Sequence, residues 1–113
     1  IEESKEFTLL IVEDNDELLQ VMIKLLNRDY NIFTARNGIE AIRVVEEQDI
    51  TLVVSDIMMP VMDGIEFCSY VKNQIEISHI PVILLTAKEK EEDKIQANEW
   101  GAAGCCNKPL NFV

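Results

Sequence analysis

VVSDIMMPVMDG, residues 53–64, is the stretch that decides the fold of this chain. It starts within an apolar run rich in β-branched residues, 52–54, which is typical of a buried strand. Asp56 stands just past that run, and Met-Pro at 59–60 and Asp-Gly at 63–64 then mark a tight loop. A carboxylate at the end of a buried strand is costly unless something uses it, and open α/β sheets bind ligands outside the carboxyl ends of their strands. We therefore predict that Asp56 is reactive; from this stretch alone, an aspartate that only caps the loop is an equal alternative.

Length and charge limit the classes of protein to consider. The chain has 113 residues, of which 48% are hydrophobic, so we expect one small domain with a single core over residues 1–113. No apolar run reaches the roughly 18 residues that a membrane-spanning helix needs, so no membrane span is expected. The net charge is −11, from 21 acidic and 10 basic residues. This balance argues against direct binding of nucleic acid or an anionic membrane, and it is compatible with a divalent cation or a partner with a basic face.

The cysteines and the first residues predict a location. Cys68, Cys105 and Cys106 are odd in number and have no CxxC spacing, which argues against a disulfide framework or a zinc site. We expect reduced thiols in a cytoplasmic protein. Residues 1–6 are polar and acidic, unlike a signal peptide, and they begin without Met, so we expect a piece of a longer polypeptide.

The rest of the chain alternates apolar strands with amphipathic helices. Strands are expected over residues 7–12, 30–34, 51–55, 82–85 and 104–107, with the second nearer an edge of the sheet. The first helix is expected from a cap at Asp14 or Asn15 to about Arg28, with an apolar stripe formed by Leu18, Met22, Leu25 and Leu26 and widened by Leu19 and Ile23. Further helices are expected over residues 39–47, 65–73 and 88–100. This alternation with short loops predicts an α/β fold with a doubly wound, parallel, five-stranded sheet.

Polar residues follow four of the expected strands at their carboxyl ends: Glu13 and Asp14, Asp56, Thr86, and Lys108. The carboxyl ends of parallel strands lie on one rim of the sheet, so these residues are expected to meet there. Each also has a structural explanation. Glu13 and Asp14 can favour a helix N-terminus, Thr86 can be a strand-end hydroxyl, and Lys108 can neutralise a buried aspartate.

The residue types at this rim suit phosphoryl transfer. Three acids that repel one another favour a hard divalent cation such as Mg²⁺, which takes carboxylate oxygens as ligands. An aspartate can act as a nucleophile toward phosphorus and form an aspartyl phosphate. The metal, a lysine ammonium and a threonine hydroxyl can then compensate the charge on the phosphoryl oxygens.

Four segments together give the chain a specific resemblance, which covers residues 9–109. They are IVED at 11–14, DIMMPVMDG at 56–64, PVILLTA at 81–87, and Gly101-Ala102 followed by Lys108-Pro109. In this order and spacing they resemble the receiver domain of two-component response regulators, a flavodoxin-like fold. The pattern is also similar to the receiver modules of hybrid sensor kinases.

The resemblance implies a role for each rim residue. Asp56 would accept a phosphoryl group from a histidine kinase or a phosphotransfer domain. Glu13 (through water), Asp14, Asp56 and the backbone carbonyl of Met58 would form the Mg²⁺ site, Thr86 and Lys108 would contact the phosphoryl oxygens, and Lys108-Pro109 would be a cis peptide. The aspartyl phosphate would then shift the conformation that controls an output. The domain itself would not be an enzyme.

Two departures from the family pattern qualify these expectations. Cys105 stands where receivers usually carry an aromatic residue that moves inward with the threonine, so the usual switch is in doubt while phosphoryl acceptance is not. The sequence also ends at Val113, before the usual final helix. We expect either an exposed apolar surface beside the first helix, a homodimer that covers it, or a truncated chain. The alternative function is an interaction or dimerisation module on the same fold that takes no phosphate; the complete acid, threonine and lysine set disfavours it.

Overall fold

A computed structural model describes residues 7–86 and 104–107 of the chain, the last residue of the first range and the whole of the second as backbone only. The strands are β1 (Thr8–Val12), β2 (Asn31–Ala35), β3 (Leu52–Asp56), β4 (Val82–Thr86) and β5 (Gly104–Asn107). The helices are α1 (Asp16–Leu26), α2 (Gly38–Glu47) and α3 (Gly64–Asn73). The expected ranges are therefore confirmed to within two residues, and the helix expected over residues 88–100 lies outside the described residues.

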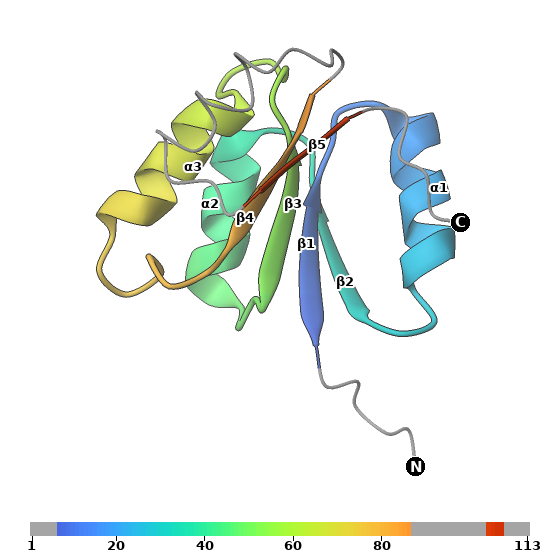
Figure 1. Ribbon diagram of the computed structural model, residues 1–113, viewed down its shortest axis with the longest axis horizontal. Helices are drawn as coiled ribbons and strands as arrows, with labels where there is room; N and C mark the ends of the chain where they lie inside the picture. The colour runs from blue at the N-terminus through green and yellow to red at the C-terminus, as the bar shows by residue number, and fades with distance from the viewer. Residues whose placement is uncertain (1–6, 87–103, 108–113) are drawn as a thin grey trace.

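The five strands form one parallel sheet in the order β2-β1-β3-β4-β5. The predicted parallel sheet and the edge position of the second strand are both confirmed. Helices α2 and α3 cover one face of the sheet and α1 covers the other (Figure 1). The two halves thus wind in opposite directions from β1, which is the doubly wound arrangement.

The unbroken apolar strands are explained by burial on both faces. In β1, Leu10 and Val12 belong to the core beneath α2 and α3, whereas Ile11 packs with Leu19 and Met22 of α1. Alternate residues of a strand point to opposite faces, so a strand covered on both sides must be apolar throughout. Phe67 of α3 is fully buried in the larger core, a position that the sequence analysis did not single out.

Side-chain hydrogen bonds cap two of the helices and hold the loop before β4. Asn15, one of the two expected caps, precedes α1 and accepts the N–H of Leu18 at 3.1 Å. Asn37 caps α2 in the same way, through the N–H of Glu40 at 3.0 Å. After α3, the Lys72 ammonium donates to the carbonyls of Ser78 (3.2 Å) and Ile80 (2.7 Å) and so closes the loop that leads to β4.

The stripe predicted for α1 needs one correction. Leu25 is 48% exposed, whereas Leu19 and Met22 are buried. Leu25 follows Leu19 by six residues, which turns it about 120° around the helix from the centre of the buried stripe, so it lies at the edge of the stripe beside the half-buried Leu18. Within the described residues, no helix has the length and apolar character needed to cross a lipid bilayer.

An apolar groove of about 530 Å³ lies beside α1 on its side of the sheet. Its walls include Met22 and Leu26 from the helix and Leu9, Val54 and Ile83 from the strands. The apolar surface expected next to the first helix is therefore present in the described residues. Among the described elements, α1 is the helix on this face, and it is too narrow to cover the face by itself.

Candidate functional site

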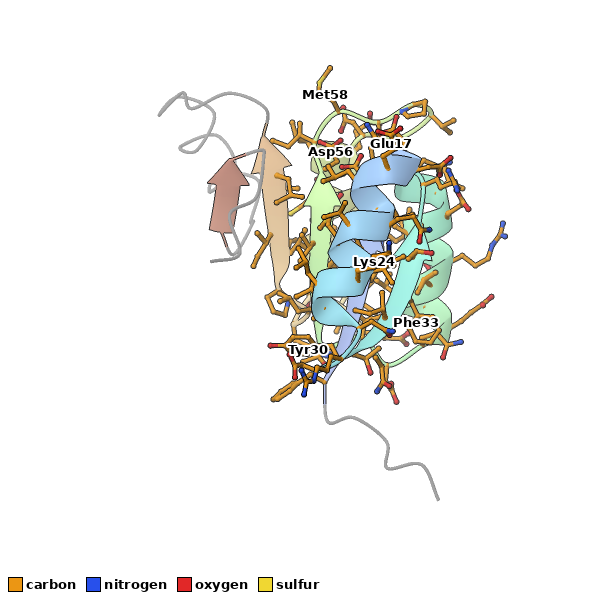
Figure 2. The ribbon with its side chains drawn as sticks, turned by 90° about the vertical axis from the view of Figure 1, so that its right-hand side faces the viewer. Glu17, Lys24, Tyr30, Phe33, Asp56 and Met58 are labelled. Carbon is orange, nitrogen blue, oxygen red and sulfur yellow. The ribbon has the colours of Figure 1, made fainter. Side chains whose placement is uncertain are left out.

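The site is built at the carboxyl ends of β1 and β3, which are neighbours in the sheet. Val12, the last residue of β1, lies opposite Ser55 of β3, so Glu13 and Asp56 occupy equivalent positions on adjacent strands. Asp56 is the last residue of β3. Figure 2 shows Asp56 at the same end of the domain as Glu17 at the start of α1, with Tyr30 at the opposite end.

Three carboxylates meet at this rim. One oxygen from each of Glu13, Asp14 and Asp56 lies within 4.8 Å of the other two. Glu13 is fully buried and Asp56 is 6% exposed, whereas Asp14 is exposed. Like charges this close and partly out of water repel strongly, and a divalent cation relieves that repulsion. One open side and several oxygen donors suit Mg²⁺, which keeps some of its waters.

Backbone hydrogen bonds hold these acids at the rim. Glu13 donates its own N–H to the carbonyl of Ala35 (2.9 Å), and its Oε2 accepts the N–H of Asn15 at 3.2 Å. Oδ1 of Asp56 accepts the N–H of Met58 at 3.4 Å. The buried side chains are thus oriented by the strand ends and the loops that follow, which fixes where their oxygens point.

The loop from β3 to α3 approaches the Asp56 backbone closely. A Cβ atom on Gly64 would lie 2.1 Å from the Asp56 carbonyl oxygen, so the position needs glycine. The Gly64 N–H donates to the Ile57 carbonyl at 2.9 Å and closes the loop at its base. Within the loop, Val61 has a φ of 70°, which is rare for a β-branched residue.

Sequence reasoning missed two features of the rim. Arg36 and Asp16 form an ion pair that joins the loop after β2 to the first turn of α1. Gly38, which the sequence marked only as part of a turn, donates its N–H to the Met62 carbonyl at 3.0 Å. Asn37-Gly38 and Pro60 signalled turns separately, and nothing local in the sequence indicated that the two turns touch.

The remaining predicted residues are placed only in part. Thr86 ends β4, the strand next to β3, and pairs in register with Asn107 of β5. Its backbone therefore reaches the same rim as Asp56, while its side chain lies outside what is described. Lys108, the Lys108-Pro109 peptide and the side chain of Cys105 also lie outside the described residues, so their expected roles stay predictions.

Comparison with known proteins gives the family. The family model described as "Response regulator receiver domain" matches residues 9–113. The chain is 41% identical over 111 residues to "Histidine kinase P4" of Formosa agariphila, covering 98% of this chain and 8% of that protein. It is 35% identical over 104 residues to the "Alkaline phosphatase synthesis transcriptional regulatory protein PhoP" of Bacillus subtilis, covering 91% of this chain and 42% of that protein. The chain thus spans less than half of either relative.

Solved structures show the same fold. The receiver domain of a signal transduction histidine kinase from Syntrophus aciditrophicus has a TM-score of 0.84 and 35% identity, over 93% of this chain and 80% of that one. The chemotaxis response regulator CheY4 of Vibrio cholerae has a TM-score of 0.85 and 32% identity, over 93% of this chain and 88% of that one. The doubly wound sheet, the acidic rim and these matches agree, and the chain belongs to the response regulator receiver domain family of two-component systems.

Proposed function

We propose that this domain is a phosphoacceptor and that Asp56 is the residue that takes the phosphoryl group. The observation that carries the proposal is the convergence of Glu13, Asp14 and Asp56, with one oxygen from each inside 4.8 Å at the carboxyl rim of the sheet. Receiver domains as a family act with histidine kinases or phosphotransfer domains and bind Mg²⁺ at an acidic pocket. For this chain we propose a phosphohistidine on such a partner as the donor.

In the proposed reaction a carboxylate oxygen of Asp56 attacks the phosphorus of the phosphohistidine. A P–O bond to Asp56 forms, the P–N bond to the imidazole breaks, and the electron pair stays on that ring nitrogen; the other ring nitrogen carries a proton, so the imidazole leaves as the neutral ring. This assignment is supported by the position of Asp56 at the end of β3, where its carboxylate accepts the Met58 N–H. We assign Thr86 and Lys108 to the phosphoryl oxygens, as a hydroxyl donor and a cation.

Glu13, Asp14, Asp56 and the Met58 carbonyl are the groups that would hold Mg²⁺. Bound there, the cation would neutralise charge on the phosphoryl oxygens during transfer. Two of the three acids are almost fully buried, so without a counter-charge they repel each other in a weakly screened environment. Conformational control of an output by the aspartyl phosphate is the expected consequence, with the degree of shift set by how differently the two states hold the phosphoryl group.

The test is the intact mass of the domain after incubation with Mg²⁺ and acetyl phosphate. One phosphoryl adduct is expected on the wild type, and none on Asp56→Asn or in the presence of EDTA. Asp63→Asn is the matched control: the half-buried Asp63 caps α3 by accepting the N–H of Glu66, and Asn caps equally well, so the adduct should remain. A folded wild type without an adduct would instead support the interaction module that takes no phosphate.

A further inference from the structure

We propose that Met62 is a positioning residue for the candidate metal site, because it seats the loop between β3 and α3 on Gly38 at the start of α2. This inference rests on the proposed function, since it concerns how the Met58 carbonyl is presented to the cation. Two elements that are far apart in the sequence meet here. The Gly38 N–H, which has no partner within its own helix, donates to the Met62 carbonyl at 3.0 Å.

The contact also fits sterically. A Cβ atom on Gly38 would lie 2.4 Å from Cγ, 2.7 Å from Sδ and 2.8 Å from Cβ of Met62. The Met62 side chain therefore occupies the space that only a glycine leaves open. Met62 is half-buried and packs against the core that α2 and α3 cover. Backbone and side chain together fasten one point of the loop to α2.

The loop needs such an anchor because it is strained between its ends. The Met62 N–H donates to the Pro60 carbonyl at 2.8 Å, which closes a three-residue turn around Val61. The φ of 70° at Val61 is that of the rare and strained form of γ-turn. The Val61 side chain is 81% exposed, so its own packing does not stabilise this conformation. The turn persists only because its surroundings hold it.

Met58 depends on that anchor. Its side chain is 76% exposed and projects outward from the domain, so it does not fasten the residue (Figure 2). Its N–H makes a long bond of 3.4 Å to Asp56. The direction of the Met58 carbonyl is then set by the fixed points on either side: Ile57, whose N–H donates to the Leu85 carbonyl (3.2 Å), and Met62 on Gly38. Loss of a group that orients a metal ligand typically lowers metal affinity about 10–100-fold.

The test is the Mg²⁺ dissociation constant, measured from the ¹H–¹⁵N amide shifts of residues 56–64 during titration. Gly38→Ala places a methyl group against Met62. Rotation of the side chain can move Cγ and Sδ away but cannot relieve the contact with Cβ, so the loop backbone must shift. We expect affinity to fall about ten-fold, the lower end of the effect of a group that orients a metal ligand. Met62→Ala, which keeps the backbone bond but loses the packing, should weaken binding less.

The double variant Gly38→Ala/Met62→Ala separates this mechanism from a general change in α2. Removal of Cγ and Sδ takes away the two shortest of the three contacts without any change of rotamer and leaves only the contact with Cβ, so the double variant should bind Mg²⁺ more tightly than Gly38→Ala alone. Ile39→Ala, at the exposed neighbouring position of α2, is the matched control and should bind as the wild type does. Wild-type affinity in both single variants, or a double variant no better than Gly38→Ala, would overturn the positioning role. If the folded wild type shows no Mg²⁺-dependent shifts, the proposed metal site fails first, and this inference with it.

Discussion

Replacement of Gly64 by alanine is the sharpest test of the geometry at the rim. An added Cβ would lie 2.1 Å from the Asp56 carbonyl oxygen, 3.0 Å from the Asp56 carbonyl carbon and 3.1 Å from Cα of Ile57. Ordinary contact begins at 3.4 Å, so the shortest distance falls short by about 1.3 Å. All three atoms belong to the backbone, so no change of rotamer relieves the overlap. The loop must move away from the end of β3.

Three contributions set the size of the effect. Overpacking of this kind costs about 1–3 kcal/mol. Movement of the loop stretches the Gly64 N–H bond to the Ile57 carbonyl, which contributes about 1 kcal/mol. The higher helix propensity of alanine opposes these losses: replacing glycine by alanine stabilises a helix interior by up to about 1 kcal/mol, and less at the first helical position. We expect the free energy of unfolding to fall by about 2 kcal/mol, equivalent to roughly 10 °C in Tm for a domain of this size.

Urea unfolding followed by circular dichroism measures this change. Ser69→Ala, at an exposed position of the same helix, is the matched control and should stay within about 0.5 kcal/mol of the wild type. The comparison holds only if the slope of the unfolding free energy against urea concentration is the same for all three proteins, because an equal slope shows that each protein exposes the same amount of surface on unfolding. A Gly64→Ala protein as stable as the control would refute the close approach of α3 to the Asp56 carbonyl.

Substitutions at three further positions test other parts of the fold. Asn37→Ala removes the cap of α2 and should lower the free energy of unfolding in urea by about 1 kcal/mol, whereas Asn37→Asp, which can still cap the helix, should be as stable as the wild type. An equal loss of stability in both variants would contradict the capping role. Lys72→Met removes two hydrogen bonds to the loop before β4 and should cost about 1–3 kcal/mol, with faster amide exchange over residues 77–80; unchanged exchange would count against the bonds. Burial raises the pKa of the Cys68 thiol above its ordinary value of 9.0, and Lys72 partly opposes this. As pH rises, the thiol of the unfolded chain therefore loses its proton before the thiol of the folded chain does, so the stability that Cys68 contributes is complete below pH 9.0 and is lost at higher pH. Cys68→Ala should therefore lose less stability than the wild type between pH 8 and pH 10, measured by urea unfolding at each pH. An equal loss of unfolding free energy in both proteins would disprove this linkage.

Local sequence patterns were sufficient for the elements and their order. The strands β1, β3 and β4 contain continuous apolar runs, at residues 9–12, 52–54 and 82–85, because they are buried within the sheet, and such runs can be recognised in the sequence. The cap at Asn15 and the turn at Asn37-Gly38 could also be predicted from the sequence, because each depends on residues that are close neighbours along the chain. The alternation of strand and helix then predicts the parallel sheet, since short crossovers are right-handed.

The meeting of Glu13, Asp14 and Asp56 was predictable for a related reason. Once strands are parallel, residues just after them share a rim whatever their separation in the sequence. The exposure of Leu25 was not predictable, because a leucine on a helix looks the same whether the neighbouring surface is a sheet or solvent.

The described helices and strands, their order and the acidic rim follow from local preferences in the sequence and from the geometry of parallel strands. The contacts that hold the loops together at that rim depend on tertiary packing. The fit of Met62 on Gly38 and the pairing of Arg36 with Asp16 each join segments that are separated in the sequence, and the close approach of Gly64 to Asp56 joins the two ends of one loop. Such contacts depend on the distances between packed helices and strands, and no local pattern encodes those distances.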